Sequence, residues 1–144
     1  MESLKTSPHS HPRWMSAVLI LAGIYNIAWG MWSIFFPTLS FAYSGLEIPD
    51  RPLNYPHLWQ CIGMIVGVYG VGYLIAARDP VRLWSLVFVG FLGKFFGPLG
   101  LAFGVFDKQM PARALLTIIP NDLIWWLPFV LILRHAHREG RAIT

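Results

Sequence analysis

Residues 83–106 read LWSLVFVGFLGKFFGPLGLAFGVF, and Lys94 is the only charged residue among them. An α-helix rises about 1.5 Å per residue and the hydrocarbon core of a bilayer is about 30 Å thick, so roughly 20 apolar residues suffice to cross it. The stretch is long enough and apolar enough to do so. It therefore predicts a membrane-spanning helix.

Three further runs have a similar length and composition. Residues 15–36 and 58–77 carry no charge, and residues 115–133 contain only Asp122. Of the 144 residues, 56% are apolar and 12% are charged, whereas soluble domains have about 25% charged residues. The first run exceeds the apolar core of a signal peptide, so we expect it to be retained. The sequence predicts one all-α domain, residues 1–144, that is an integral membrane four-helix bundle with up-down-up-down topology.

The basic residues outside these runs are unevenly distributed between the two sides of the predicted membrane. One side has seven, namely Lys5, Arg13, Arg78, Arg82, Arg134, Arg138 and Arg141, and the other has Arg51, Lys108 and Arg113. Because positive residues collect on the cytoplasmic side, we expect both termini to be cytoplasmic. The expected location is the cell inner membrane or plasma membrane. Charges spread in this way do not form a nucleic-acid-binding patch, despite a net charge of +4.

Small residues recur at spacings of three and four along three of the runs. Lipid gives little hydrophobic reward for helix association, so small residues that allow close approach supply much of it. We expect packing seams, either within one bundle or between the copies of a homodimer or larger membrane complex. The glycines are Gly90, Gly93, Gly97, Gly100 and Gly104, then Gly63, Gly67 and Gly70, then Gly23 and Gly30.

Polar side chains are predicted near the centre of the membrane. Lys94 lies near the middle of its run, and Asp122 is the only acidic residue within the four runs. A charge at this depth costs at least about 2.5 to 3.5 kcal/mol, so we expect the two side chains to pair. The predicted ligand-binding residues are Asn26, Gln60, Lys94, Asn121, Asp122, Tyr25, Trp29, Trp125 and Trp126.

Prolines interrupt the backbone hydrogen bonds around these residues. Proline has no amide hydrogen, so it leaves the carbonyl four residues before it without a helical donor. Such a carbonyl in lipid needs water, a side chain or a ligand. The prolines are Pro98, Pro120 and Pro128, and the carbonyls are those of Lys94, Leu116 and Ile124. With the aromatic rings, this pattern indicates an outward-opening pocket for a small lipophilic ligand.

Cysteine and histidine indicate neither a metal site nor a cofactor. Cys61 is the single cysteine, which excludes a dithiol site, and we expect it to be a small buried residue. The pairs His9 with His11 and His135 with His137 have no supporting cysteine or carboxylate, so we expect no bound metal. No histidine lies mid-membrane to ligate a haem.

Two further features concern the membrane surface. Trp14, Trp59 and Trp84 fall near predicted helix ends, where an indole can anchor a helix at the headgroups. The connection 37–57 contains four prolines around an apolar stretch. We expect it to lie on the outer bilayer surface or to cap the bundle.

The size, the four spans, the glycine-rich helices and the polar set Asn26, Lys94 and Asp122 resemble small bacterial four-helix membrane proteins of DoxX-like type. The resemblance covers the hydrophobic pattern of the whole chain and transfers no catalytic residue. It implies one possible function, a membrane anchor subunit of a redox complex.

Two other functions follow from the polar residues. The protein could bind or transport a small lipophilic or cationic solute, with Asp122 accepting a proton or cation and Lys94 as its partner. It could instead be a membrane enzyme on an isoprenoid, quinone or lipid substrate, with Asp122 as general acid or base and Lys94 tuning it. A purely structural role, in which these residues only hold the helices together, also stays open.

Overall fold

The computed structural model describes residues 11–47, 53 and 55–142. These residues contain helices and turns but no strand. The elements are α1 (Arg13–Phe35), α2 (Pro37–Tyr43), α3 (Pro56–Ala76), α4 (Trp84–Phe106), the 3₁₀ helix η1 (Ala112–Thr117), the π-helix η2 (Ile119–Leu123) and α5 (Ile124–Ala142). Lys5, His9, Arg51 and the side chain of Arg141 lie outside the described residues.

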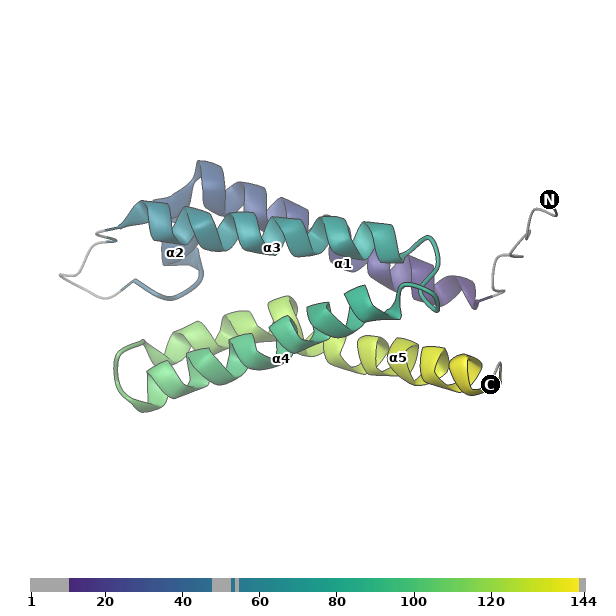
Figure 1. Ribbon diagram of the computed structural model, residues 1–144. Coiled ribbons are helices and arrows are strands. Elements are labelled where there is room, and N and C mark those ends of the chain that lie inside the picture. The colour runs from purple at the N-terminus through teal and green to yellow at the C-terminus, as the bar shows by residue number, and fades with distance from the viewer. Residues whose placement is uncertain (1–10, 48–52, 54, 143–144) are drawn as a thin grey trace.

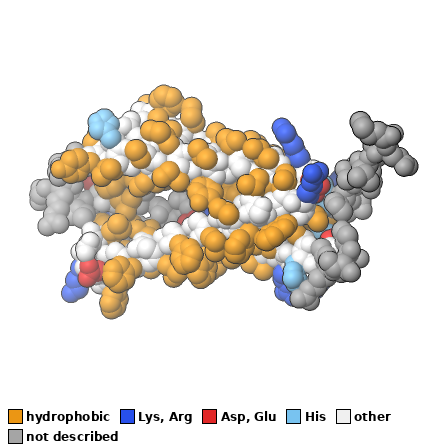
Figure 2. All heavy atoms as spheres, in the orientation of Figure 1, with side chains coloured by type: hydrophobic (Ala, Val, Ile, Leu, Met, Phe, Trp, Pro, Cys, Tyr) orange, Lys and Arg blue, Asp and Glu red, His pale blue; other side chains and the backbone are white. Residues whose placement is uncertain are grey.

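Four segments of the described chain are long and apolar enough to cross a membrane, namely α1, α3, α4 and the segment Ala112–Glu139. Figure 1 shows each span running antiparallel to the one before it, so that α1 begins and α5 ends at the same end of the bundle. In Figure 2, hydrophobic side chains cover the middle of the visible face and its Lys and Arg side chains lie at the two ends. The predicted all-α membrane bundle is confirmed, and the chain is a multi-pass membrane protein.

The limits of the first three spans agree with the sequence prediction to within two residues, but the fourth differs. The single helix predicted at 115–133 begins instead with a 3₁₀ turn at Ala112 and a π turn at Ile119–Leu123, and α5 continues to Ala142. Pro120 lies inside the π turn and cannot donate to the carbonyl of Leu116, so the regular α-helical hydrogen bonding is interrupted at this point. The irregular segment carries Asn121 and Asp122.

The four spans form two pairs, α1 with α3 and α4 with α5, as the two layers of Figure 1 show. A Cβ atom added to Gly30 would lie 2.5 Å from the carbonyl oxygen of Gly63, and one added to Gly70 would lie 2.7 Å from that of Gly23. No side chain fits at these contacts, so α1 and α3 touch through their backbones. This is the close packing expected from the glycines of these two helices.

The glycine stripe of α4 differs from the packing seam that its spacing predicts. A Cβ added to Gly97 or Gly100 would meet no atom within 4 Å, because these glycines face open space rather than a helix. At Gly90 the ring of Tyr73 occupies the space, and an added Cβ would clash with it. The stripe therefore makes room for one aromatic ring and, beyond it, for a cavity.

Apolar side chains fill the half of the bundle in which α1 begins and α5 ends. This core contains Met15, Leu19, Ala22, Tyr73, Ala76, Ala77, Val87, Phe129 and Ile132. The rings of Tyr73 and Phe129 meet edge to face, with centroids 5.1 Å apart. Because every span contributes to the core, this half of the bundle is closed.

The opposite end of the bundle is capped by α2, as one of the two predictions for the connection 37–57 has it. The indole of Trp59 is only 8% exposed and donates to the hydroxyl of Ser40 on α2 over 2.8 Å. The prediction that Trp59 anchors the bundle at the lipid surface is therefore wrong, whereas Trp14 and Trp84 are exposed as anchors would be. Cys61 was expected to be buried and is exposed on α3 instead.

Candidate functional site

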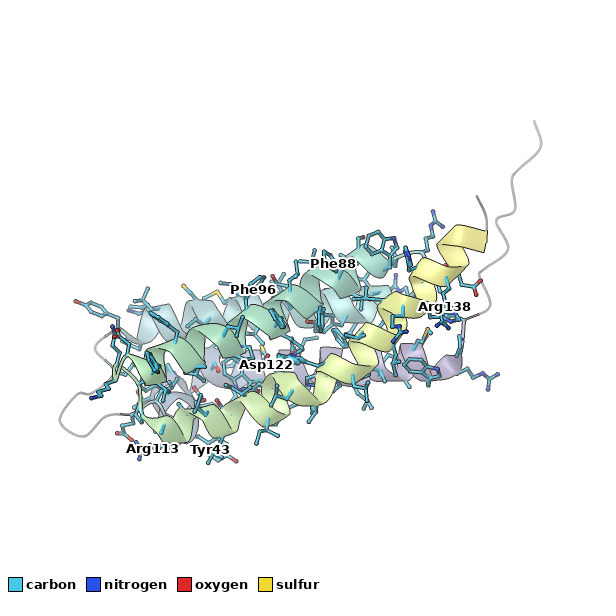
Figure 3. The ribbon with its side chains drawn as sticks, turned by 90° about the horizontal axis from the view of Figure 1, so that it is seen from below. Tyr43, Phe88, Phe96, Arg113, Asp122 and Arg138 are labelled. Carbon is cyan, nitrogen blue, oxygen red and sulfur yellow. The ribbon has the colours of Figure 1, made fainter. Side chains whose placement is uncertain are left out.

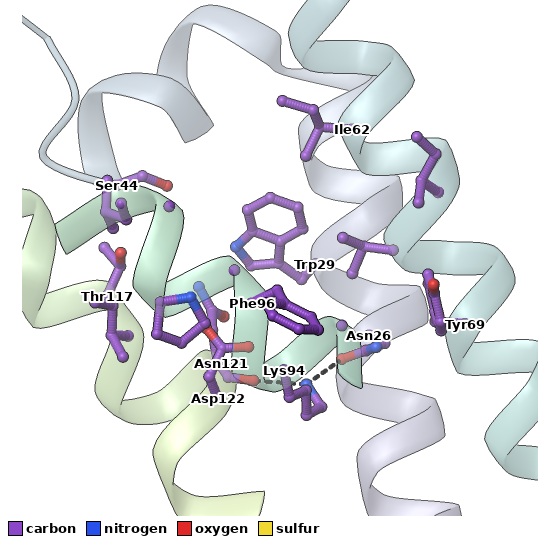
Figure 4. Close-up of a pocket in the computed structure, with 18 of the residues that line it drawn as sticks. Asn26, Trp29, Ser44, Ile62, Tyr69, Lys94, Phe96, Thr117, Asn121 and Asp122 are labelled. Atoms are coloured by element: carbon purple, nitrogen blue, oxygen red, sulfur yellow. Dashed lines mark hydrogen bonds between the residues drawn. The ribbon is translucent and has the colours of Figure 1, made fainter. Parts of the chain in front are cut away.

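A cavity of about 540 Å³ lies between the two helix pairs, in the half of the bundle nearer α2. Small-molecule sites in proteins commonly have volumes of about 300 to 1,000 Å³. Aromatic, aliphatic and glycine residues make up most of its lining. Polar atoms come from a few residues, which are Asn26, Ser44, Tyr69, Tyr73, Lys94, Thr117, Asn121 and Asp122. Figure 4 labels all of these except Tyr73, and they come from α1, α3, α4, the irregular segment 112–123 and the end of α2.

The cavity exists because one of its walls has no side chains. Gly93, Gly97 and Gly100 of α4 line it, and nothing fills the space in front of the last two. Ile65 of α3 and Phe96 of α4 also line it while remaining more than half exposed, so they form the rim of its mouth. The face seen in Figure 2 is hollowed between these two helices. The cavity thus opens sideways, where hydrocarbon would surround the bundle.

Lys94 lies at the end of the cavity nearer Tyr73 and the closed core, and it is 6% exposed. Its ammonium group donates to Oδ1 of Asn26 over 3.3 Å and to the backbone carbonyl of Asn121 over 2.6 Å, the two dashed contacts of Figure 4. The rings of Tyr73 and Trp125 lie 6.0 and 5.8 Å from the ammonium nitrogen, within the range of cation–π attraction. The buried charge is therefore stabilised by two oxygens and two rings.

Asp122 lines the same cavity but does not pair directly with Lys94. Within the described chain no ion pair of 4.0 Å or less joins the two side chains. The π turn instead presents the backbone carbonyl of Asn121 to the ammonium group. The expected direct contact is therefore absent. Lys94 and Asp122 both line the cavity, but the ammonium group contacts the carbonyl of Asn121 and not the carboxylate.

The hydrogen bonds around Lys94 also join three of the spans. Tyr25 of α1 donates its hydroxyl to Oδ1 of Asn121 over 2.5 Å. Trp126 of α5 donates its indole N–H to the backbone carbonyl of Lys94 over 2.9 Å. Pro98 leaves this carbonyl without a helical donor, so the side-chain partner expected from the sequence is present. The cluster therefore has a structural role whatever else it does.

The structure brings five of the nine predicted binding residues to the cavity, namely Asn26, Trp29, Lys94, Asn121 and Asp122. The other four do not line it. Tyr25 and Trp126 support its polar residues from behind, and Trp125 donates to the carbonyl of Pro120 over 3.1 Å. Gln60 donates to the carbonyl of Ile34 over 2.8 Å, nearer the capped end.

Four polar residues of the cavity lining were not predicted from the sequence, namely Ser44, Tyr69, Tyr73 and Thr117, and a usable signal existed for Tyr69 and Tyr73 of α3. Their separation of four residues places them on one face of a helix, and two hydroxyls inside an apolar run need polar surroundings. That spacing was the available signal. Tyr73 belongs both to the cavity lining and to the closed core, so its ring separates the two.

Comparisons with known proteins give limited information. No family model matches the chain, and no solved structure gives a significant match. A chloride/fluoride channel protein of Pseudomonas syringae pv. tomato is 31% identical over an alignment of 115 residues, and the match covers 72% of this chain and 25% of that protein. The chain thus spans about a quarter of the length of this relative. The match agrees with a small membrane protein, and the DoxX-like resemblance stays a prediction.

Proposed function

We propose that the protein binds a small lipophilic solute in the cavity between α3 and α4 and moves it across the membrane. The observation that carries the proposal is the glycine wall of α4, which leaves about 540 Å³ of space in front of a buried ammonium group. Side chains at Gly97 and Gly100 would fill part of this space, so their absence leaves room for a solute.

The chemistry of the lining supports a mainly apolar solute with one polar group. The mouth lies between Ile65 and Phe96, where lipid surrounds the bundle, so such a solute can enter from the bilayer. Two of the three ammonium hydrogens of Lys94 are used by Asn26 and Asn121, which leaves one for an acceptor atom of the solute. A solute whose only charge is positive fits less well, because Lys94 repels it at the end of the cavity nearer Tyr73.

The one-sided cavity supports transport rather than storage. It is open in the half of the bundle nearer α2 and closed in the other half, where Tyr73 packs on Gly90 and Phe129. Transport requires that Tyr73 move away from Gly90 and Phe129 while the half of the bundle nearer α2 closes, as in alternating access. The contact between α1 and α3 is the rigid part, because their backbones touch at Gly30 and Gly63.

A second candidate is the passage of a halide ion. It is favoured by the name of the relative and by the ammonium group in the cavity wall, which is the kind of donor that an anion needs. The carboxylate of Asp122 on the same wall disfavours it, because it repels an anion. The two candidates differ in the solute and can be separated in the same vesicles.

Solute binding can be tested with two fluorescent probes that share their rings. N-phenyl-1-naphthylamine is neutral, and 1-anilinonaphthalene-8-sulfonate adds a sulfonate. In detergent, we expect saturable binding of at least one probe to the wild type and to Gly72→Phe, whereas Gly97→Phe gives only the linear signal of micelle partition. Both glycines have open space in front of them, but only Gly97 lines the cavity. Identical titrations for all three proteins would contradict the proposal.

Transport can be measured with the anionic probe, which crosses lipid slowly. Liposomes that contain trapped albumin report its entry as a rise in emission, and we expect faster entry with the wild type and with Gly72→Phe than with Gly97→Phe. Entry no faster than in protein-free liposomes would overturn the transport step. Chloride or fluoride efflux from the same vesicles, measured with ion-selective electrodes and lost in Lys94→Met, would support the halide candidate instead.

A further inference from the structure

A second cavity, of about 340 Å³, lies at the end of the bundle where α1 begins and α5 ends. It shares no residue with the cavity around Lys94. Its lining comes from the start of α1 and the last turns of α5, namely Pro12, Trp14, Met15, Leu131, Arg134, His135 and Arg138. Figure 3 shows Arg138 at this end and Arg113 at the opposite one. Neither its charge nor its shape is explained by the proposed transport function.

The polar side of this cavity is positively charged. Arg134 and Arg138 are one helical turn apart on α5, so they share one face of the helix. Within the described part of the chain, no carboxylate pairs with either guanidinium group. Two adjacent cations without an acidic partner repel each other, and an anion between them removes the repulsion.

His135 is the third nitrogen-bearing side chain on this side. Its Nε2 atom is buried and makes no hydrogen bond in the described structure, and the nearest carboxylate oxygen, of Glu139, is 4.0 Å away. A buried polar atom without a partner is rare and costs about 1 to 3 kcal/mol. An oxygen acceptor in the cavity would supply the missing partner.

The start of α1 adds to the positive electrostatic potential of the cavity. The first turn of this 23-residue helix has no side-chain cap, and Pro12 and Trp14 of that turn line the cavity. The amino end of a helix carries a partial positive charge and favours anions. Two arginines and a helix end thus bring positive potential to one small space, and His135 adds a hydrogen-bonding nitrogen.

The other side of the cavity is apolar, formed by Trp14, Met15 and Leu131. Trp14 and Leu131 are partly exposed, and Trp14 lies in the first turn of α1, at the end of a span where headgroups and acyl chains meet. A free phosphate ion would use only the polar side. A ligand with a phosphate group next to a hydrophobic body would use both.

We propose that this cavity binds the phosphate group of an anionic membrane lipid between Arg134 and Arg138, with its glycerol and upper acyl chain on Trp14, Met15 and Leu131. Basic pockets between spans at the membrane surface are suited to such headgroups. The lipid would bridge α1 and α5, the first and last spans, at the end where the bundle is closed.

The proposal can be tested by native mass spectrometry of the whole protein in detergent, with phosphatidylglycerol and phosphatidylcholine added in equal amounts. The variant Arg134→Ala with Arg138→Ala removes the two cations of the cavity. The control Arg78→Ala with Arg82→Ala removes two exposed cations from the turn between α3 and α4, at the same end of the bundle but outside the cavity. Size-exclusion chromatography checks that each variant is folded.

We expect the wild type and the control to prefer phosphatidylglycerol, and the cavity variant to lose about 25-fold of that preference, at about fivefold for each arginine. If the double variant does not fold, Arg138→Gln alone should lose about fivefold. Equal losses in both double variants would show general surface attraction and overturn the site. Inorganic phosphate that displaces the lipid adduct at millimolar concentration would assign the cavity to the free ion and overturn the lipid.

Discussion

The indole nitrogen of Trp126 lies 2.9 Å from the backbone oxygen of Lys94, the oxygen that Pro98 leaves without a helical donor. One hydrogen bond thus closes a gap in α4 and attaches α5 at the residue whose side chain carries the cavity's ammonium group. The backbone of Lys94 is held from one side while its side chain is held by Asn26 and Asn121 on the other. The position of the charge is therefore fixed by three separate segments.

Trp126→Phe should destabilise the protein by about 1 to 3 kcal/mol, because it leaves a carbonyl in an apolar region without a donor. The ring keeps most of its contact with Phe95, whose centroid is 5.3 Å away. The free energy of unfolding can be measured by chemical denaturation in detergent. In a Pro98→Ala background, residue 98 supplies the missing amide hydrogen, so the same change should cost less. An equal cost in both backgrounds would show that the hydrogen bond is not what Trp126 contributes.

Gly90→Ala should destabilise the protein by about 1 to 3 kcal/mol, the usual effect of overpacking a core. A Cβ at this position would lie about 2.2 Å from the nearest ring atom of Tyr73, which has no room to retreat because Phe129 packs on it. Gly97→Ala is the matched control on the same helix face, since its Cβ would meet open space. Thermal unfolding in detergent compares the two, and a similar shift for both would contradict the distinction between core and cavity along α4.

Lys94→Met should cost about 3 kcal/mol, because Asn26 and Asn121 lose their donor and the Asp122 carboxylate loses its compensating cation. Adding Asp122→Leu should recover part of this loss, since no charge then remains at membrane depth. Unfolding measurements on the two single variants and the double variant give the coupling energy. The double variant also separates structure from function. A folded protein that still binds the naphthylamine probe would assign these residues a structural role only.

The sequence predicted the spans well because length and apolar composition alone decide whether a helix can cross a bilayer. It also predicted that the carbonyl of Lys94, four residues before Pro98, needs a hydrogen-bond donor. It could not name Trp126 as that partner, because this depends on how α4 and α5 are rotated against each other. Charge and depth placed Lys94 near Asp122, but the π turn rotates the chain so that the neighbouring carbonyl of Asn121 makes the contact instead.

Glycine spacing was the least decisive signal. Gly63 and Gly97 occupy similar three-and-four patterns, yet Gly63 touches the backbone of α1 and Gly97 faces a cavity. The pattern shows only that side chains are absent from one stripe of the helix. Whether a neighbouring backbone or a ligand occupies that stripe depends on whether another helix packs against it. Here α1 packs against Gly63 and Gly70 of α3. No helix packs against Gly97 and Gly100 of α4.

The distribution of basic residues predicts cytoplasmic termini, and cysteine labelling can test this orientation. In a Cys61→Ser background, Gln109→Cys lies in the connection after α4 and His137→Cys lies near the end of α5, at opposite ends of the bundle. Both positions are exposed, and neither substitution changes the number of Lys or Arg residues. A membrane-impermeant maleimide should label Gln109→Cys in intact cells and His137→Cys only after permeabilisation. The reverse pattern would place Arg134 and Arg138 outside the cell and the mouth of the larger cavity in the cytoplasmic half of the membrane, so that solute would enter from the inner leaflet.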